Sequence, residues 1–475
     1  MSLWHRRLIE RSRAPATMAQ GLWLGLFALL VRLGIVAWAA GRFPPADDGQ
    51  FYQVFAERLA RGLGYTWLWP DGAVTFAAHY PVGYPALLAL AYWAFGSAPV
   101  VAMLVNAAVG ALGVVGVHRI ARAVAPAGPA ALCGLIAALH PSLTAYTPAL
   151  MTEGVTAALL AVLGAAAVSL SEHRRLPWLS FAALAVGTGL VLLVRPQMLL
   201  FAPVLGAVSR AGSRARTKVA AAAGVTALAL LVCLPWTLRN CARMDRCVLV
   251  SANMGWNLFI GSAPGATGTF VPLERLGVPE ECRTVYGEAD KDHCFAGAGL
   301  RNIRRDPMHY LGLVPAKLAA TFDWSGAPGY YLHASNPSAF AAGQKLGLGV
   351  VEAVVQRLVV LACVFGLGRA EGPRRRLRLG LGVLAGVLLF FKTAYISHLL
   401  LVVQAALLGR WLWRRPDVAL GAAVVLATAG SHALFFGAGR YGLVCVPLLV
   451  ALSAAAFVGP GRVRADRGEL GPGAR

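Results

Sequence analysis

The sequence predicts an all-α polytopic membrane protein, and its composition and charge pattern lead to that prediction. Of its 475 residues, 58% are hydrophobic and 13% are charged, against about 25% charged residues in a soluble domain. The mean hydropathy is +0.63. The net charge of +22 falls in short clusters between apolar runs of about 20 residues, which is how a bilayer-spanning chain is oriented. These properties exclude a disordered chain, a disulfide-dense miniprotein, an ordinary cytosolic enzyme and a nucleic-acid-binding protein.

Twelve apolar stretches fit the spacing of the basic clusters, with both termini on the cytoplasmic side. The first stretch exceeds the roughly 7–15 residues of a signal-peptide core, so we expect a retained helix. The predicted spans are 18–40, 99–121, 129–147, 149–170, 178–194, 196–209, 218–236, 345–368, 379–393, 396–412, 417–436 and 443–459. The clusters expected on the cytoplasmic side are 5–13, 119–122, 173–175, 210–218, 369–378, 410–415 and 462–467.

Two short apolar segments are predicted as half-inserted or interfacial helices on the outer side. Residues 84–96 form an apolar run of only 13 residues, too short to cross about 30 Å of hydrocarbon. Counting this run as a span would invert every later loop. Residues 310–322 are interpreted in the same way.

The predicted spans divide the chain into three regions. Residues 1–236 form an N-terminal transmembrane core that includes an outer loop at 41–98, residues 237–344 form a large outer loop, and residues 345–475 form the C-terminal transmembrane helices. The large loop holds four cysteines, whereas the other four lie in apolar runs. Cysteines confined to one extracytoplasmic loop indicate disulfides, and of three connectivities the short-range one is favoured: Cys241–Cys247 with Cys282–Cys294. Metal binding is the alternative, although no CxxC spacing occurs.

An acidic pair opens the first outer loop. Asp47 and Asp48 precede Phe51, Phe55 and Leu59, whose spacing of four predicts an amphipathic helix on the membrane surface. One interpretation is a capping box, in which Asp47 pairs with the side chain three residues later, Gln50. The other is a carboxylate held ionised near the headgroups by a helix N-terminus. The two are compatible, because one aspartate can cap the helix while the other performs chemistry.

A second set of charged residues is expected at the same outer level. Glu153 opens the fourth span, where it either complements the helix dipole or lines an outward-facing polar cavity. Arg195 and Arg440 either extend to the headgroups or contact a phosphate, and His79 precedes the short helix at 84–96 as a structural or a functional histidine. No P-loop, nucleotide-binding motif or HExxH occurs, and transporter acids would lie deep in several helices. The pattern favours an enzyme acting on a lipid-linked phosphate over a pump.

Six segments in order then resemble the GT-C superfamily of membrane glycosyltransferases. The nearest branch is the family 39 type, which comprises protein O-mannosyltransferases and the lipid A aminoarabinose transferase. The resemblance covers about residues 18–455. Its segments are DGQFYQVFAERLARGLGY (48–65), HYPVGYPALLAL (79–90), ALHPSLTAYTPALMTE (138–153), LLVRP (192–196), LPWTLRN (234–240) followed by GWNLFIGSAPGATG (255–268), and GRYGLVCVPLLVAL (439–452).

The resemblance implies a GT-C fold of about twelve transmembrane helices with juxtamembrane helices. It also implies that residues 1–236 hold a catalytic core that moves a sugar, with inversion, from a polyprenyl phosphate to an acceptor at the non-cytoplasmic face. The family's acidic hallmark maps onto Asp48, because Tyr52 follows four residues later, and Asp47 supplies the second acid. At the position of His79 relatives carry a Lys or Arg near the donor phosphate. Tyr80 replaces a proline, and Ala78 stands where the aminoarabinose transferase has a glutamate, which weakens that specific assignment and any metal site that needs the glutamate.

Roles then follow from the resemblance. Asp48 is the expected base, Glu153 lines the cavity, and the donor phosphate is expected at three cationic side chains: Arg195, His79 and Arg440. Tyr52, Trp256 and Asn257 are expected to contact substrate. No cofactor is required, although paired acids bind a divalent metal readily.

The expected partners are a polyprenyl-phosphate-linked sugar and membrane lipids, with protein, lipid and envelope glycan open as acceptors. The Ala-, Gly- and Arg-rich composition suggests a bacterium with a GC-rich genome, and hence undecaprenyl or decaprenyl phosphate in the inner membrane. The resemblance implies that the site faces the periplasm. A flippase for a lipid-linked sugar and a non-catalytic envelope subunit are the alternatives.

Overall fold

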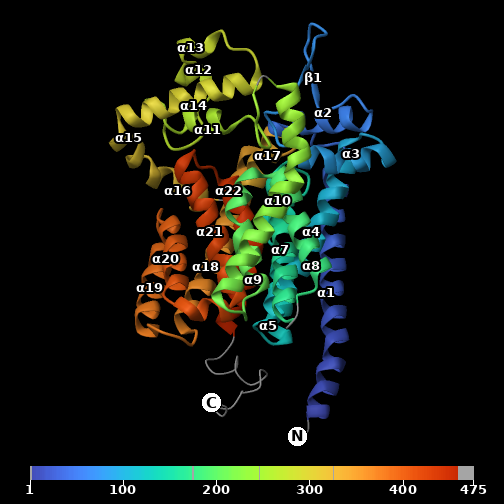
Figure 1. The fold of residues 1–475 in the computed structure, drawn as a ribbon, viewed down its shortest axis with the longest axis vertical. Coiled ribbons are helices and arrows are strands. Elements are labelled where there is room, and N and C mark those ends of the chain that lie inside the picture. Colours follow the sequence, from blue (N-terminus) through green and yellow to red (C-terminus); the bar gives the residue numbers. More distant parts are fainter. Residues whose placement is uncertain (1–2, 174–175, 245, 325, 458–475) are drawn as a thin grey trace.

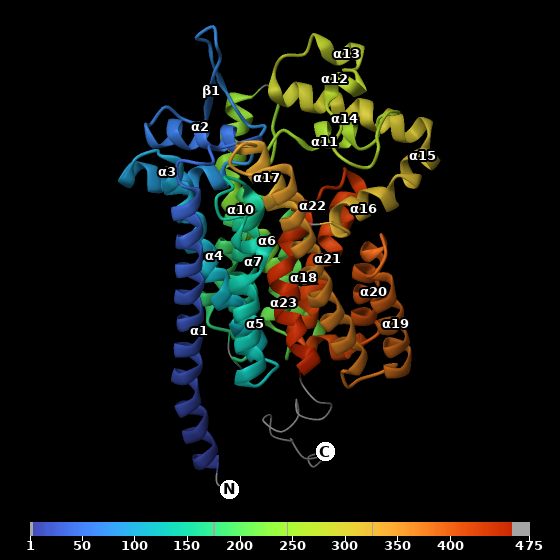
Figure 2. The same cartoon turned by 180° about the vertical axis from the view of Figure 1, so that it is seen from behind.

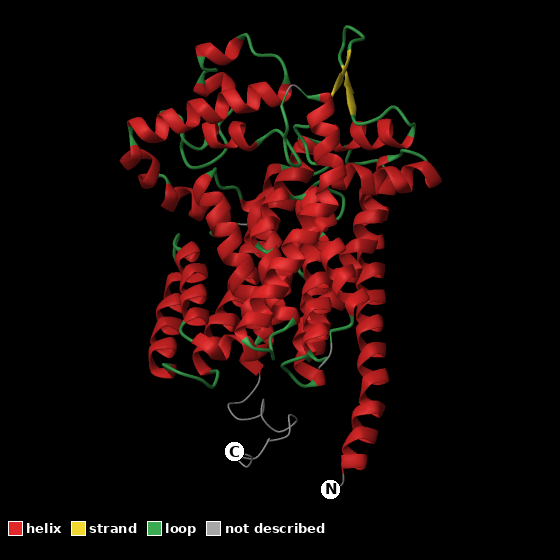
Figure 3. Cartoon of the chain, in the orientation of Figure 1, coloured by secondary structure: helices red, strands yellow, loops and turns green. Residues whose placement is uncertain are grey.

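The computed structural model of the protein describes residues 3–173, 176–244, 246–324 and 326–457, and for residues 3–17 it describes the backbone alone. The basic cluster expected at 462–467, the side chains of 5–13 and residues 174–175 therefore lie outside the described part. A bundle of long helices is covered at one end by a layer of shorter ones (Figure 1). Figure 3 shows that helices make up almost the whole chain, with a single pair of strands projecting from the covered end.

The first half of the bundle is built from apolar helices around a small-residue core. Gly116 shows how closely they pack, because an added Cβ would lie 2.6 Å from the backbone of Ala161 in the facing helix. The elements are α1 (Leu3–Ala39), α4 (Pro99–Arg122), α5 (Ala127–Leu139), α6 (Pro141–Thr144), α7 (Thr152–Ser171), α8 (Trp178–Val194), the 3₁₀ helix η1 (Pro196–Leu200), α9 (Ala202–Ser209) and α10 (Ala215–Arg243).

The second half of the bundle follows the large loop and packs against α4, α5 and α7. Its elements are α18 (Ala342–Arg369), α19 (Arg375–Leu388), α20 (Ala394–Ala406), η2 (Gly409–Arg414), α21 (Pro416–Leu434), α22 (Gly439–Gly442), η3 (Leu443–Cys445), α23 (Val446–Ser453) and η4 (Ala454–Phe457).

The covering layer is formed by the two outer regions that the sequence predicts. The first contributes α2 (Asp48–Ala60), α3 (Gly83–Phe95) and a hairpin of β1 (Thr66–Leu68) with β2 (Val74–Phe76), in which Thr66 pairs with Phe76. The second contributes α11 (Met254–Ile260), α12 (Leu273–Leu276), α13 (Glu280–Arg283), α14 (Glu288–Arg305), α15 (Pro307–Gly312), α16 (Val314–Phe322) and α17 (Ala327–Ser335). Both views place this layer at the end of the bundle opposite the start of α1 (Figures 1 and 2).

The structure agrees with the expectation that residues 84–96 do not span the bundle and that both outer regions lie at the same end of it. The 13-residue helix α3 lies across the covered end instead of along the bundle (Figure 2). Among the described residues, seven helices are long and apolar enough to cross a membrane, and further apolar helices are shorter. The chain is thus an integral membrane protein by the length and composition of its helices, and the full count of twelve spans stays a prediction.

Several element boundaries differ from those expected; for example, the span predicted at 396–412 ends as a helix at Ala406 and is followed by the 3₁₀ helix η2. The span predicted at 129–147 is broken after Leu139, because Pro141 begins a new short helix and a proline cannot continue the hydrogen-bond ladder. The segment 310–322 forms two helices, α15 and α16. Helix α10 continues through Pro235 to Arg243, so the boundary expected at residue 236 falls inside a helix.

Two disulfides and a short bridge hold the large loop in place. Cys241 is bonded to Cys247 and Cys282 to Cys294, the connectivity favoured by the sequence. Gly437, just before α22, donates its N–H to the Gly268 carbonyl at 2.9 Å. The loop therefore contacts the last helices of the bundle directly beside the site described below.

Candidate active site

A cavity of about 1260 Å³ lies between the large loop and the covered end of the bundle. Its floor comes from the start of α2, the segment before α3, the N-terminus of α7, the end of α8, and α21 with α22. The side of the cavity opposite this floor is formed by residues 246–257 and α14 of the large loop. This volume exceeds the range of about 300–1,000 Å³ typical of small-molecule sites, so the cavity has room for two substrates side by side.

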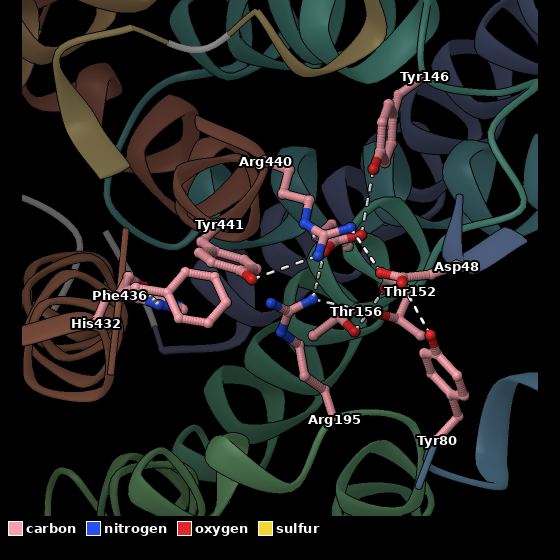
Figure 4. Close-up of polar contacts among 11 residues, drawn as sticks. Asp48, Tyr80, Tyr146, Thr152, Thr156, Arg195, His432, Phe436, Arg440 and Tyr441 are labelled. Atoms are coloured by element: carbon pink, nitrogen blue, oxygen red, sulfur yellow. Dashed lines mark hydrogen bonds and ion pairs between the residues drawn. The ribbon is translucent and has the colours of Figure 1, made fainter. Parts of the chain in front are cut away.

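Asp48 and Arg440 form an ion pair in this cavity (Figure 4). Arg440 Nη1 lies 2.8 Å from Asp48 Oδ2, and the Tyr80 hydroxyl donates to Asp48 Oδ1 at 3.0 Å. Burial raises the pKa of Asp48, but the Arg440 charge and these hydrogen bonds outweigh it, so the pKa lies below its usual value. Burial and the Asp48 charge raise the pKa of Tyr80, which keeps its hydroxyl a donor. The Asp48 side chain is 29% exposed, so a substrate in the cavity can reach it.

Glu153 is the second carboxylate of the site and is almost fully buried. Its Oε1 lies 3.0 Å from Arg195 Nη1 and 3.6 Å from Arg440 Nε, and the Tyr146 hydroxyl donates to its Oε2 at 3.2 Å. Arg440 thus bridges both carboxylates, while Arg195 also donates to the Thr152 hydroxyl at 3.1 Å. Two acids and two arginines leave the network neutral, which is how a protein keeps buried charges at tolerable cost.

The two arginines share an aromatic wall. The guanidinium carbons of Arg195 and Arg440 each lie 5.2 Å from the centre of the Tyr441 ring. On this ring His432 stacks at 4.0 Å with an interplanar angle of 8°, and His432 Nδ1 lies 2.9 Å from the Phe436 carbonyl oxygen. Figure 4 shows the guanidinium groups of Arg195 and Arg440 close together between the Tyr441 ring and Asp48, and both arginines line the cavity.

The backbone that carries His79 is held by the large loop. Glu288 Oε2 accepts hydrogen bonds from the N–H groups of Ala78 at 2.6 Å and His79 at 2.9 Å, and Ala252 N–H donates to the Ala78 carbonyl at 2.7 Å. The His79 ring then meets Trp256 edge-to-face at 5.4 Å. Sequence reasoning missed Glu288, because it lies more than 200 residues from its partners and its surroundings carry no motif.

Tyr331 of α17 is a second residue that the sequence did not reveal. Its buried hydroxyl oxygen accepts hydrogen bonds from the Ala46 N–H at 3.3 Å and the Leu150 N–H at 3.2 Å. Ala46 lies two residues before Asp48, and Leu150 lies three residues before Glu153. One oxygen atom therefore joins the two segments that carry the two acids.

The predicted site residues come together with one exception. The side chains that line the cavity are those of Asp48, Tyr52, His79, Glu153, Arg195, Trp256, Asn257 and Arg440. Asp47 is exposed instead, and the expected capping box with Gln50 is wrong, because the Asp47 side chain makes no capping hydrogen bond. Its backbone takes φ 50°, which turns the residue out of the usual N-cap geometry. Burial and the Asp48 charge raise the pKa of Asp47.

The acidic pair does not fit a divalent metal. In the part of the chain that the structure describes, no group of three or more His, Cys, Asp or Glu side chains is arranged to hold a metal ion. The Asp48 carboxylate faces Arg440 and Tyr80, whereas Asp47 lies outside the cavity lining. The chemistry below uses no metal.

Neither protein-family models nor curated protein sequences match this chain. Among solved structures, it is similar to the Archaeoglobus fulgidus oligosaccharyltransferase tethered with an acceptor peptide, at 15% identity and a TM-score of 0.46 over 92% of this chain. It is also similar to ArnT from Cupriavidus metallidurans bound to undecaprenyl phosphate, at 17% identity and a TM-score of 0.40 over 92% of this chain and 78% of ArnT. The chain spans 49% of the archaeal protein. At these values the likeness is one of fold.

Proposed function

We propose that this protein is an inverting glycosyltransferase that moves a sugar from a polyprenyl-phosphate donor to an acceptor at the outer face of the membrane. The observation that carries the proposal is the meeting of one accessible carboxylate and two arginines in a large cavity at the covered end of an apolar bundle. A lipid-linked donor can present its phosphate at this level while its chain stays among the spans. The bacterial inner membrane, with the cavity facing the periplasm, is part of the same proposal.

The donor phosphate would bind at Arg195, Arg440 and His79. Guanidinium groups suit phosphate geometry because they offer several donors in a plane. Arg440 is held by Asp48 and Glu153 in the absence of donor. A phosphate that enters the cavity competes for this guanidinium, and its negative charge offsets the positive charge that holds the Asp48 pKa low.

Donor binding would therefore raise the pKa of Asp48 toward its usual value, so that its carboxylate accepts a proton more readily. Asp48 Oδ2 takes the proton from the acceptor nucleophile, whose electron pair attacks the anomeric carbon from the side opposite the phosphate. The bond from this carbon to the phosphate oxygen breaks, and the electron pair leaves with the polyprenyl phosphate. Arg195, Arg440 and His79 stabilise the charge that develops on that oxygen. Attack from the opposite side inverts the anomeric centre.

Other cavity residues would orient the substrates. Glu153 lies too deep and too firmly paired to be the base, so it positions Arg440 and Arg195. Tyr52 lies beside Tyr80 under the donor sugar, and Trp256 with Asn257 faces the acceptor from the large loop. Protein, lipid and envelope glycan all stay open as the class of acceptor.

Transfer by the purified Asp48→Asn protein tests the proposal. The wild-type protein in lipid nanodiscs is given a radiolabelled polyprenyl-phosphate sugar and a membrane extract as acceptor. We expect release of polyprenyl phosphate by the wild type, a loss of at least 100-fold in Asp48→Asn, and little change in the matched control Asp47→Asn, whose acid lies outside the cavity lining.

Two outcomes would count against the proposal. A folded Asp48→Asn protein with wild-type turnover would remove the assigned base. A donor that crosses vesicle membranes without cleavage of its sugar–phosphate bond would show a flippase instead.

A further inference from the structure

A buried arginine in the first span has no counter-charge among the residues that the structure describes. Arg32 lies in α1 within the candidate span Met18–Ala39 and is only 2% exposed. It stands seven residues below Ala39, which is about 10 Å along the helix. An arginine at such a depth is costly unless its charge is compensated.

In the described part of the chain, the Arg32 guanidinium donates to two acceptors, both through Nη1. These are the Ala28 carbonyl at 3.2 Å and the Ala138 carbonyl at 3.4 Å. Within the described residues, no ion pair includes Arg32 and no protein acceptor meets its Nε or Nη2. The side chain cannot extend to the lipid headgroups either, because it is enclosed by neighbouring helices.

A small cavity adjoins this guanidinium. It has a volume of about 30 Å³, and Arg32, Gly110, Thr147 and Gly154 are among its lining residues. Gly110 makes room for the arginine, because an added Cβ would lie 2.6 Å from Arg32 Nε. At about 10–15 Å³ per water-sized probe, the space holds two waters or one small ion.

The end of a helix adds positive potential to the same cavity. Helix α7 begins at Thr152 without a side-chain cap, and its N-cap residue Met151 and first-turn residues Gly154 and Val155 line the cavity. The acid of this turn, Glu153, lines the candidate active site instead, where Arg195 and Arg440 pair with it. The N-terminus of such a helix carries about +0.5 charge, which offsets the negative end of α5 near Ala138. The Thr147 side chain, a potential hydroxyl donor, lines the cavity as well.

We infer that this cavity is a binding site for a small monovalent anion of the size of chloride, held by Arg32, Thr147 and the N-terminus of α7. The site is a different cavity from the proposed catalytic centre, although Tyr146, whose hydroxyl bonds Glu153, lines it. The inference does not depend on the proposed function. Water would fill the space but would leave the buried positive charge uncompensated. An anion there would also hold the segment 138–154, which leads from α5 to Glu153.

Halide-dependent stability tests the site. The wild-type protein in nanodiscs is heated in chloride, bromide or gluconate at equal ionic strength, since gluconate is too large for the cavity. At ten times the dissociation constant, chloride should raise the ratio of folded to unfolded protein about 11-fold. Crystals soaked in bromide should show an anomalous peak beside Arg32.

Two variants and a control separate binding from general stability. Thr147→Val should lower the apparent chloride affinity several-fold, and Arg32→Met should abolish the halide dependence. If Arg32→Met does not fold, Thr147→Val alone decides. Thr188→Val removes an equally buried hydroxyl that bonds within α8 and should keep the wild-type dependence. Equal melting in chloride and gluconate, or a bromide map without a peak in the cavity, would overturn the inference.

Discussion

Removal of the Tyr331 hydroxyl should slow turnover more than it weakens donor binding. In Tyr331→Phe the ring stays in place, but the N–H groups of Ala46 and Leu150 lose their shared acceptor. Distances of 3.3 and 3.2 Å are at the long end for such bonds. Each donor left buried and unsatisfied costs about 1 kcal/mol, so unfolding should be easier by about 2 kcal/mol.

The same change loosens the spacing between the two acid-bearing segments. We expect kcat to fall about tenfold, equivalent to about 1.4 kcal/mol, because Asp48 is then less well placed toward the acceptor. The KM for the donor should change less than threefold, since Arg195 is held from α8 and α7. Stopped-time transfer assays in nanodiscs with saturating acceptor measure both constants.

Tyr330→Phe is the matched control. Tyr330 lies on the same helix but is 53% exposed, and its contact with Lys345 is made by the ring. It should keep both stability and kcat. If Tyr331→Phe loses stability while kcat is unchanged, the hydroxyl only supports the fold, and the reasoning about spacing is refuted.

Three further predictions concern the charged side chains. Asp48 has a lowered pKa, so its pairing stabilises the fold above the usual carboxyl pKa, and this stabilisation is lost as the pH falls through the lowered value. Arg440→Gln removes the main group that opposes the effect of burial on the Asp48 pKa, while the Tyr80 hydrogen bond stays, so the acidic limb of kcat/KM should move to higher pH. Glu288→Gln keeps an acceptor oxygen for the backbone of 78–79 but loses the charge, so donor KM should rise about three- to tenfold with kcat nearly unchanged. An unaltered KM would contradict the role of Glu288 in holding the backbone of His79. Arg195→Ala should weaken donor binding by at least tenfold without changing acceptor preference, as measured by competition between acceptors.

Local patterns in the sequence predicted most of the architecture. Apolar runs and basic clusters depend on residues close together in the chain, so they predicted the long apolar helices and the short helix α3. Asp48, Glu153, Arg195 and Arg440 were each suspected because a charge at the edge of a span needs an explanation. The sequence could not predict that Arg440 bridges both carboxylates, because that contact depends on how α22 meets α2 and α7.

The residues that the sequence missed act over long separations. Glu288 and Tyr331 bond backbone N–H groups, which carry no residue-specific signal, at separations of 181 residues or more. The capping box was wrongly predicted for the opposite reason. Residues 47 and 50 fit the short sequence motif, but the backbone of Asp47 has φ 50°, which prevents the capping geometry. The end of α10 was missed because the apolar run ends at Trp236, whereas the helix continues over a polar stretch that includes Arg239 and Asn240 to Arg243.

Helix α10 also determines how far from the membrane the large loop covers the cavity. Its 29 residues span about 44 Å, whereas the hydrocarbon is about 30 Å thick. We therefore expect its last turns to extend beyond the hydrocarbon. From these turns Arg239 donates hydrogen bonds to the backbone carbonyls of Ala77 and Tyr65. One residue inserted into the helix would shift this attachment by about 1.5 Å along the helix axis and rotate it by about 100°, so the length of α10 sets where the segment 246–257, which lines the cavity, begins.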